Sequence, residues 1–381
     1  MCIWCERSPI AGLLTAGWTP ALPQRRASPA GEPATGPGAT PRSADVVFRN
    51  GTIRTMAGGP DPVEALALSG TRIVAAGSAA DLAALTTAAT TVVDLDGRTV
   101  LPGLIDPHHH YTLSAVLGRL LLDIGYSTYP ARQDALSALR SAAMKTPPGQ
   151  WIAAGFYDNL LQGGELSMAA LDAVSAQHPI FVMYVNGHVG AGNSMAFERA
   201  GIGPEVGTIA GGGHFGRAAD GTLDGLIYEQ PALMRFLSVA VPPSTPRLIA
   251  EALTDYAKQA AAAGNTTLHE PGTVKPDWVE HLAQLSNALD VRLSASFSTD
   301  DVEASRNFAA LSPAGTARRV AGSRFSLYGM KFWADGSNQA EMAAQTQPYL
   351  HSTEKGSANY RVDEMTRLCR AALDLLRTGL V

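Results

Sequence analysis

Residues 101–110 read LPGLIDPHHH, and the rest of the chain is organised around this stretch. A mostly apolar run ends in an Asp-Pro pair and three consecutive histidines. Side chains of an extended chain alternate between two faces, so we expect His108 and His110 to point the same way and His109 into the opposite wall. Two imidazoles on one face can bind one metal ion, because zinc sites take neutral histidine nitrogens. A purely solvated histidine cluster is the alternative, but the position at the end of an apolar strand favours a metal site.

The composition indicates a folded protein with a substantial core. Of the 381 residues, 46% are hydrophobic and 17% are charged, which is too few charges for a disordered chain. The net charge of −5 argues against nucleic acid and anionic membranes as partners. No apolar run is long enough to span a bilayer, and Cys2, Cys5 and Cys369 form no disulfide framework. We expect a cytoplasmic protein, although the weakly apolar residues 9–22 leave export open.

Residue composition and periodicity divide the chain into three regions. Residues 1–43 form a leader that we expect to be disordered, since residues 23–43 are rich in proline, glycine and alanine. Residues 44–100 contain three hairpin patterns and predict a small β-domain, the first hairpin turning at Asn50-Gly51 and the third at Asp96-Gly97. Residues 101–381 alternate between strand and helix signals, which predicts parallel strands joined by helices.

The predicted elements of the third region have polar residues at their ends. Strand-like runs lie at 120–125, 151–156, 180–185, 265–269, 292–296 and 327–333, and helices near 132–144, 168–176, 194–200, 230–238, 246–263, 275–289, 300–310 and 362–378. The strand ends carry His108/His110, Asp158, His188, His269/Glu270 and Lys331/Asp335. In a (β/α) barrel the carboxyl ends of the strands carry the chemistry, so this recurrence predicts a barrel enzyme.

Five stretches, in this order, resemble the amidohydrolase superfamily and, within it, amidohydrolase family 3, which includes N-substituted formamide deformylases. They are DLDGRTVLPGLIDPHHH at 94–110, NGHVGAGNSMAFERAGI at 186–202, DGTLDGLIYE at 220–229, AGNTTLHEPG at 263–272 and MKFWADGS at 330–337. The resemblance covers about residues 44–381. It implies an α/β fold, a TIM-like (β/α) barrel of the metal-dependent hydrolase type, with residues 44–100 as half of a composite β-sandwich.

The resemblance also implies a metal site with one or two divalent ions, most often zinc. Its ligands map onto His108 and His110, and onto Lys331, which in the family is often carbamylated so that it bridges two metals. An ordinary ammonium group would repel divalent cations, so this lysine must be converted or neutral. A surface lysine is the alternative, and the apolar residues around Lys331 argue against it.

Further residues take substrate-binding roles by the same resemblance. They are His188, Asn193, His269, Glu270 and Asp335, of which Glu270 stands where the family usually carries an aspartate. The family places more metal ligands and a general base on later strands, and the only histidine after Lys331 is His351. We therefore expect an incomplete barrel, truncated after about its fourth to fifth unit.

Two functions remain open at this stage. The first is a metal-dependent hydrolase of non-peptide carbon-nitrogen bonds in a small amide, formamide or cyclic amide, acting through metal-activated water. The second is a non-catalytic amidohydrolase-like scaffold that binds ligand or regulates without turnover. A serine hydrolase is disfavoured because no G-x-S-x-G motif occurs at a strand-to-helix turn. We expect neither nucleic acid nor a membrane as partner, and a homo-oligomer is possible.

Overall fold

The computed structural model describes most of the chain from residue 43 onward. The described residues are 43–59, 61–209, 213–243, 245–274, 278–298, 318–319, 322–336, 338, 343–350 and 352–377. The predicted leader up to residue 42 and the predicted helix at 300–310 lie outside them. The chain forms two compact units, one reaching Leu104 and the other running from Ile105 onward.

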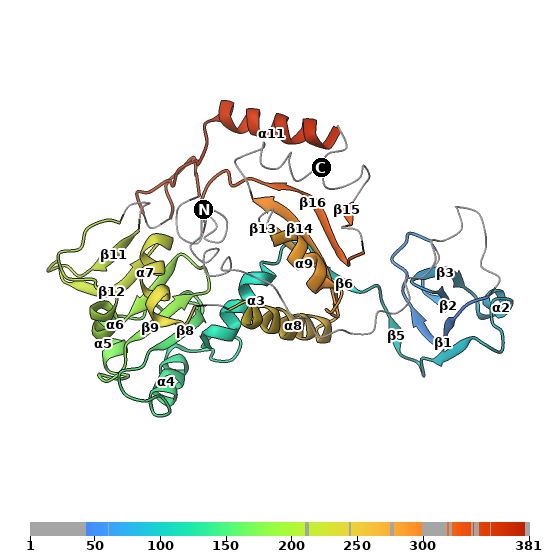
Figure 1. The fold of residues 1–381 in the computed structure, drawn as a ribbon, viewed down its shortest axis with the longest axis horizontal. Coiled ribbons are helices and arrows are strands. Elements are labelled where there is room, and N and C mark those ends of the chain that lie inside the picture. Colours follow the sequence, from blue (N-terminus) through green and yellow to red (C-terminus); the bar gives the residue numbers. More distant parts are fainter. Residues whose placement is uncertain are drawn as a thin grey trace. The chain divides into compact units, whose positions relative to one another are not determined.

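The unit that ends at Leu104 is a small, mostly β-structured unit (Figure 1). Its strands are β1 (Val46–Ile53), β2 (Val63–Ser69), β3 (Arg72–Gly77), β4 (Thr91–Asp94) and β5 (Thr99–Val100), with the short helix α2 (Ala79–Ala83). The sheet order is β3-β2-β1-β4, and β5 also pairs with β1. Small and branched apolar side chains, such as Val47, Ala67 and Leu82, form its core.

Two of the three predicted hairpins are wrong. The antiparallel hairpin of β2 and β3 is present, but β1 runs straight through Asn50-Gly51, and β4 and β5 each pair with β1 in parallel. Asn50 has a φ of 59°, and its side chain donates a hydrogen bond to Asp94. Any Cβ at Gly51 would collide with the carbonyl of Arg98 and the side chain of Leu95. The Asn-Gly pair therefore makes an irregularity within one strand, where the connection between β4 and β5 packs closely, and not a turn.

The unit from Ile105 onward contains two sheets with helices (Figure 1). The first has the order β11-β12-β10-β9-β8-β7, from β7 (Leu122–Asp123), β8 (Ile152–Tyr157), β9 (Ile180–Tyr184), β10 (Val189–Gly192), β11 (His214–Arg217) and β12 (Leu223–Tyr228). Strands β7, β8 and β9 are parallel, whereas β10, β11 and β12 are joined by antiparallel pairing. The associated helices are α4 (Arg132–Ala143), α5 (Met168–Asp172), α6 (Ser194–Arg199) and α7 (Gln230–Ala240).

The second sheet has the order β15-β16-β14-β13-β6. Its strands are β6 (Leu104–Asp106), β13 (Asn265–Val274), β14 (Arg292–Ser298), β15 (Arg318–Arg319) and β16 (Phe325–Lys331). The helices packed with it are α3 (Tyr111–Leu120), α8 (Pro246–Ala262) and α9 (Val279–Ser286), and α11 (Val362–Arg377) follows later in the chain. Strands β13, β14 and β16 are parallel. The α/β class is as predicted. Within the described chain, however, the strands of this unit belong to two separate sheets.

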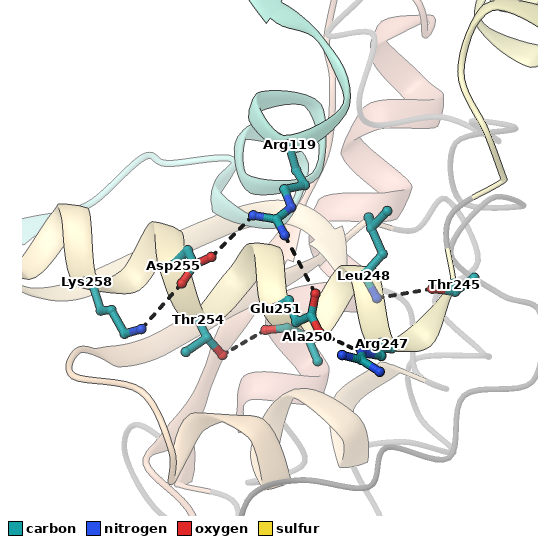
Figure 2. Close-up of polar contacts among 9 residues, drawn as sticks. All are labelled: Arg119, Thr245, Arg247, Leu248, Ala250, Glu251, Thr254, Asp255 and Lys258. Atoms are coloured by element: carbon teal, nitrogen blue, oxygen red, sulfur yellow. Dashed lines mark hydrogen bonds and ion pairs between the residues drawn. The ribbon is translucent and has the colours of Figure 1, made fainter.

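Helix α3, which the sequence did not predict, shares its residues between two hydrophobic clusters. Tyr111, Ala115 and Val116 pack with α8, α9 and the second sheet, while Leu113 and Leu117 pack with the first sheet and α7. Figure 2 shows Arg119 on α3 reaching the exposed carboxylates of Glu251 and Asp255 on α8, at 3.7 and 3.5 Å. Exposed ion pairs of this kind contribute little to stability, so apolar packing holds α3 in place.

Candidate functional site

The three histidines lie in the short segment between β6 and α3. The rings of His108 and His110 come together, with centroids 5.5 Å apart and planes 85° apart. The ring of His109 turns elsewhere, with Nδ1 2.8 Å from an Asp106 oxygen and Nε2 2.7 Å from the hydroxyl of Tyr256 on α8. The side chains thus divide as alternation predicts, although β6 ends at Asp106 and the histidines follow it in a loop.

The imidazole of His110 is hydrogen-bonded to a buried carboxylate. Nδ1 of His110 lies 3.0 Å from Oε1 of Glu270 on β13, and the backbone N–H of Thr112 donates to Oε2 at 2.9 Å. Glu270 has no solvent exposure. The carboxylate therefore caps the first turn of α3, where unpaired N–H groups and the helix dipole favour negative charge. A carboxylate that accepts a hydrogen bond from one ring nitrogen also orients the other nitrogen toward a metal. In known metal sites, carboxylates that do not themselves bind the metal hold the ligating histidines in this way.

Lys331, the last residue of β16, reaches the same part of β13. A Cβ placed on Gly272 would lie 2.6 Å from Cβ of Lys331 and 3.1 Å from the ring of Trp333, and Gly272 has a φ of +88°. Only glycine satisfies both conditions, so the lysine stem rests on the bare backbone two residues after Glu270. Nζ of Lys331 is 5.8 Å from the centroid of the Trp333 ring. The contacts of His110 and Lys331 thus converge on residues 270–272.

The histidine pair fits a shared metal ion. Histidine nitrogens bind zinc at about 2.0–2.1 Å, so two imidazoles on one ion at a tetrahedral angle have centroids about 5 Å apart. The observed 5.5 Å is close to that separation. No group of three or more His, Cys, Asp or Glu side chains able to hold a metal occurs among the described residues. Lys331 is the remaining predicted ligand, and it could bind a metal only in converted form.

His269 lies on the other face of β13 from Glu270. Its Nδ1 and Nε2 are 2.9 and 3.1 Å from the hydroxyls of Ser294 and Ser296 on β14. Burial lowers the pKa of His269 below its usual value and outweighs the opposing charge of Glu270. A cavity of about 560 Å³ opens beside it, and its walls include Pro107, Arg292 and Arg324. This cavity lies within the size range of small-molecule sites.

Strand β13 is longer than predicted, because it continues to Val274 through Pro271 and Gly272. The expectation that His269 and Glu270 close a strand is wrong. The Pro-Gly pair produces a shift in register against β14 instead of a break. The extra length brings Gly272 to Lys331.

Both polar atoms of the Asn193 side chain are hydrogen-bonded to backbone groups. Its Oδ1 accepts from the N–H groups of Ile180 and Ala196, and its Nδ2 donates to the carbonyls of Ser175 and His178. An amide of this kind has no hydrogen-bonding capacity to spare. The predicted contact of Asn193 with substrate would require one of these four bonds to break.

The remaining two predicted substrate residues lie apart in different parts of the fold. His188 follows β9 and is 2% exposed, with Nδ1 3.1 Å from an oxygen of Glu229. Asp335 follows β16, forms an isolated bridge with Ala358 and accepts a hydrogen bond from the N–H of Ala344. Glu229 was missed as a site residue, although it ends one of the quoted motifs. Its role depends on a contact across 41 positions that the sequence does not show.

Comparison with known proteins places most of the chain in one family. The sequence profile of the amidohydrolase family matches residues 91–374. The chain is 29% identical over 246 residues to the protein LONG AFTER FAR-RED 3 of Arabidopsis thaliana, covering 63% of this chain and 40% of that protein. It is 27% identical over 192 residues to the N-substituted formamide deformylase of Arthrobacter pascens, covering 49% and 35%. It is also 27% identical over 316 residues to the exoenzymes regulatory protein AepA of Pectobacterium carotovorum, covering 80% and 66%.

Solved structures give the same fold. An uncharacterized metal-dependent hydrolase from Pyrococcus horikoshii superimposes with a TM-score of 0.58 at 18% identity, over 87% of this chain and 63% of that one. A second, from Pyrococcus furiosus, gives 0.56 at 18% identity, over 87% and 65%. The chain belongs to the amidohydrolase family. It spans 40% and 35% of the first two curated relatives. No helix in the described part is long and apolar enough to cross a membrane.

Proposed function

We propose that this chain carries the metal-binding part of a hydrolase that cleaves carbon-nitrogen bonds in small amides. The observation that supports it most is the convergence on residues 270–272 of β13. There Glu270 holds His110, and Gly272 makes room for Lys331. Family membership and the fold of the metal-dependent hydrolases add support.

His108, His110 and Lys331 would hold the divalent ion, with zinc as the preferred candidate. When bound, the metal supplies a nucleophilic water at neutral pH and polarises the carbonyl. The protein residues supply orientation. Glu270 accepts from Nδ1–H of His110, so Nε2 would be the nitrogen that binds the metal, and the capped start of α3 fixes the position of the ring.

The role of Lys331 requires that its positive charge be removed. Carbamylation would do so, and a neighbouring group is suited to the product. The indole N–H of Trp333 is buried in the described part of the chain without a hydrogen-bond acceptor. A buried donor left unpaired is costly, and a carboxylate on the nearby lysine would offer it oxygens to bind. We propose Trp333 as the group that stabilises this form.

In this proposal the two sheets of the larger unit belong to one distorted (β/α) barrel, and the smaller unit to a β-sandwich. The parallel strands β7, β8, β9, β13, β14 and β16 follow the order of such a barrel, with a helix between β7 and β8, between β8 and β9, and between β13 and β14.

The test is chelator-reversible hydrolysis by the purified native protein. Release of amine from an amide, a formamide and a cyclic amide is measured before chelation, after it, and after zinc is restored. We expect activity that follows the metal and is lost in His110→Ala, while His214→Ala, an exposed histidine on β11, retains it. The proposal fails if the native protein neither binds metal nor hydrolyses any of the three.

Binding without turnover is the second candidate. It is favoured by the lack of a three-residue His, Cys, Asp or Glu group in the described chain, and one relative is named as a regulatory protein. In that case the affinity for an amide ligand would be unchanged by His108→Ala and His110→Ala. A metal-dependent hydrolase would lose both binding of metal and turnover.

A further inference from the structure

Another histidine-carboxylate pair, His188 with Glu229, lies in connections beside the sheet that contains β9. His188 is 2% exposed, and its Nδ1 is 3.1 Å from Oε2 of Glu229. The backbone is tied as well, because the N–H of Glu229 donates to the carbonyl of His188 at 2.7 Å. The two residues lie in different connections of the chain. His188 is between β9 and β10, and Glu229 is between β12 and α7.

The turn that carries His188 has a single defined shape. Oδ1 of Asn186 accepts from the N–H groups of His188 and Val189, and Gly187 takes a φ of +69°. Val189 then pairs with Tyr228 in the antiparallel ladder, directly before Glu229. Side-chain, turn and ladder contacts therefore fix the imidazole against the carboxylate.

Glu229 holds this position with a backbone conformation that favours glycine. Its φ is 67° and its ψ is 158°, a region that residues with a Cβ seldom occupy and that concentrates at functional sites. The neighbouring buried histidine, His178, shows what a purely structural one looks like. It is 4% exposed and bonds to the Ser175 hydroxyl and the Thr146 carbonyl, with no carboxylate.

The chemistry of the pair leaves one nitrogen for a ligand. A carboxylate only accepts, so Nδ1 of His188 carries the proton and Nε2 keeps its lone pair. No hydrogen bond to that Nε2 occurs in the described part of the chain. A buried imidazole with an unoccupied acceptor suits a partner that donates a hydrogen bond.

We propose that Glu229 is a positioning residue that fixes His188 as a hydrogen-bond acceptor through Nε2 for an N–H group of the ligand. This inference rests on the proposed function, which supplies the amide class. It narrows the class to primary and secondary amides, which keep an N–H. Fully N-substituted amides would lose this contact.

The test reads the tautomers directly by ¹⁵N NMR of the histidine-labelled native protein at about pH 8, where unperturbed imidazoles are neutral. His188 is expected to carry its proton on Nδ1. His178 is expected to carry it on Nε2, because the Thr146 carbonyl can only accept. The same spectrum therefore contains a control of opposite sign. Glu229→Ala should shift His188 to the Nε2–H tautomer, Glu229→Gln should restore most of the Nδ1–H form, and His178 should not change in either variant.

Acetamide and N,N-dimethylacetamide are matched probes for the ligand. We expect acetamide to move the Nε2 resonance of His188 and the dimethyl compound, which has no N–H, to leave it in place. An Nε2–H tautomer of His188 in the native protein overturns the proposal, and so do equal responses to the two probes. If Glu229→Ala does not fold, the native tautomers and the two probes still decide. Failure of the hydrolase proposal shows separately, as an absence of metal-dependent amine release.

Discussion

Replacing Glu270 by alanine is the sharpest test of how the histidine segment is held. The side chain has no exposure and accepts two hydrogen bonds, from Nδ1 of His110 and from the N–H of Thr112. Alanine removes both acceptors and leaves the two donors facing an apolar space. It also removes a negative charge from the start of α3, where the helix dipole favours one.

The size of the effect follows from these losses. Each buried donor left unpaired costs about 1–3 kcal/mol, and the lost dipole interaction adds about 0.3–1 kcal/mol. We expect Glu270→Ala to lower the free energy of unfolding by about 3–5 kcal/mol, the range for breaking a buried charged pair. Glu270→Gln should cost about 1–3 kcal/mol, because the amide keeps one acceptor and turns an NH₂ toward the other donor.

The free energy of unfolding of each variant is measured by urea unfolding followed by tryptophan fluorescence. Trp278 is a suitable reporter because it packs in the same core cluster as α3. The matched control is Glu251→Gln on α8. Glu251 bears two ion pairs, to Arg119 and Arg247, but is exposed (Figure 2), so its loss should change stability by no more than about 0.5 kcal/mol. Equal effects of the alanine variant and this control would refute the capping role of Glu270.

Three further changes test other parts of the account. Tyr111→Phe should leave stability unchanged or raise it by about 1 kcal/mol in thermal unfolding, because the buried Tyr111 hydroxyl has no partner in the described chain; a clear loss would show that it has one. Gly272→Ala should cost about 2 kcal/mol or more and lower metal retention, because the added methyl meets Lys331 and φ is +88°; unchanged metal content would contradict the placement of Lys331. The pKa of His269 is lowered in the fold from 6.5, so the unfolded chain binds more protons in that window. The stabilising contribution of His269 is thus complete above about pH 6.5 and is lost as the pH falls through the folded pKa. His269→Asn should flatten the pH dependence of stability of the metal-free protein between pH 5 and 7, and an unchanged slope would show that the histidine is not buried as described.

Local patterns in the sequence predicted what depends on neighbouring residues. The alternation of three histidines predicted that His108 and His110 would separate from His109, and this needs only backbone geometry. The parallel strands and their helices followed from apolar periodicity. The Asn50-Gly51 pair shows the limit of such reasoning, because the same residues that favour a turn also fit a close approach between strands.

The contacts that organise the candidate site join distant residues and could not be read from local patterns. His110 and Glu270 are 160 positions apart, and His188 and Glu229 are 41 apart. Strand β10 was also missed, since its sequence VGAG lacks the bulky residues of a typical strand. A Cβ on Gly190 would lie 2.6 Å from the side chain of Leu233, so packing requires the small residue that removed the strand signal.

Metal content measures the central claim most directly. The purified native protein is equilibrated with zinc, separated from free ion and analysed by elemental mass spectrometry, alongside His110→Ala, Lys331→Met and the control His214→Ala. We predict stoichiometric zinc in the native protein and in the control, with affinity reduced at least about tenfold in the other two. Native protein without zinc would contradict the claim, as would equal retention by all three variants.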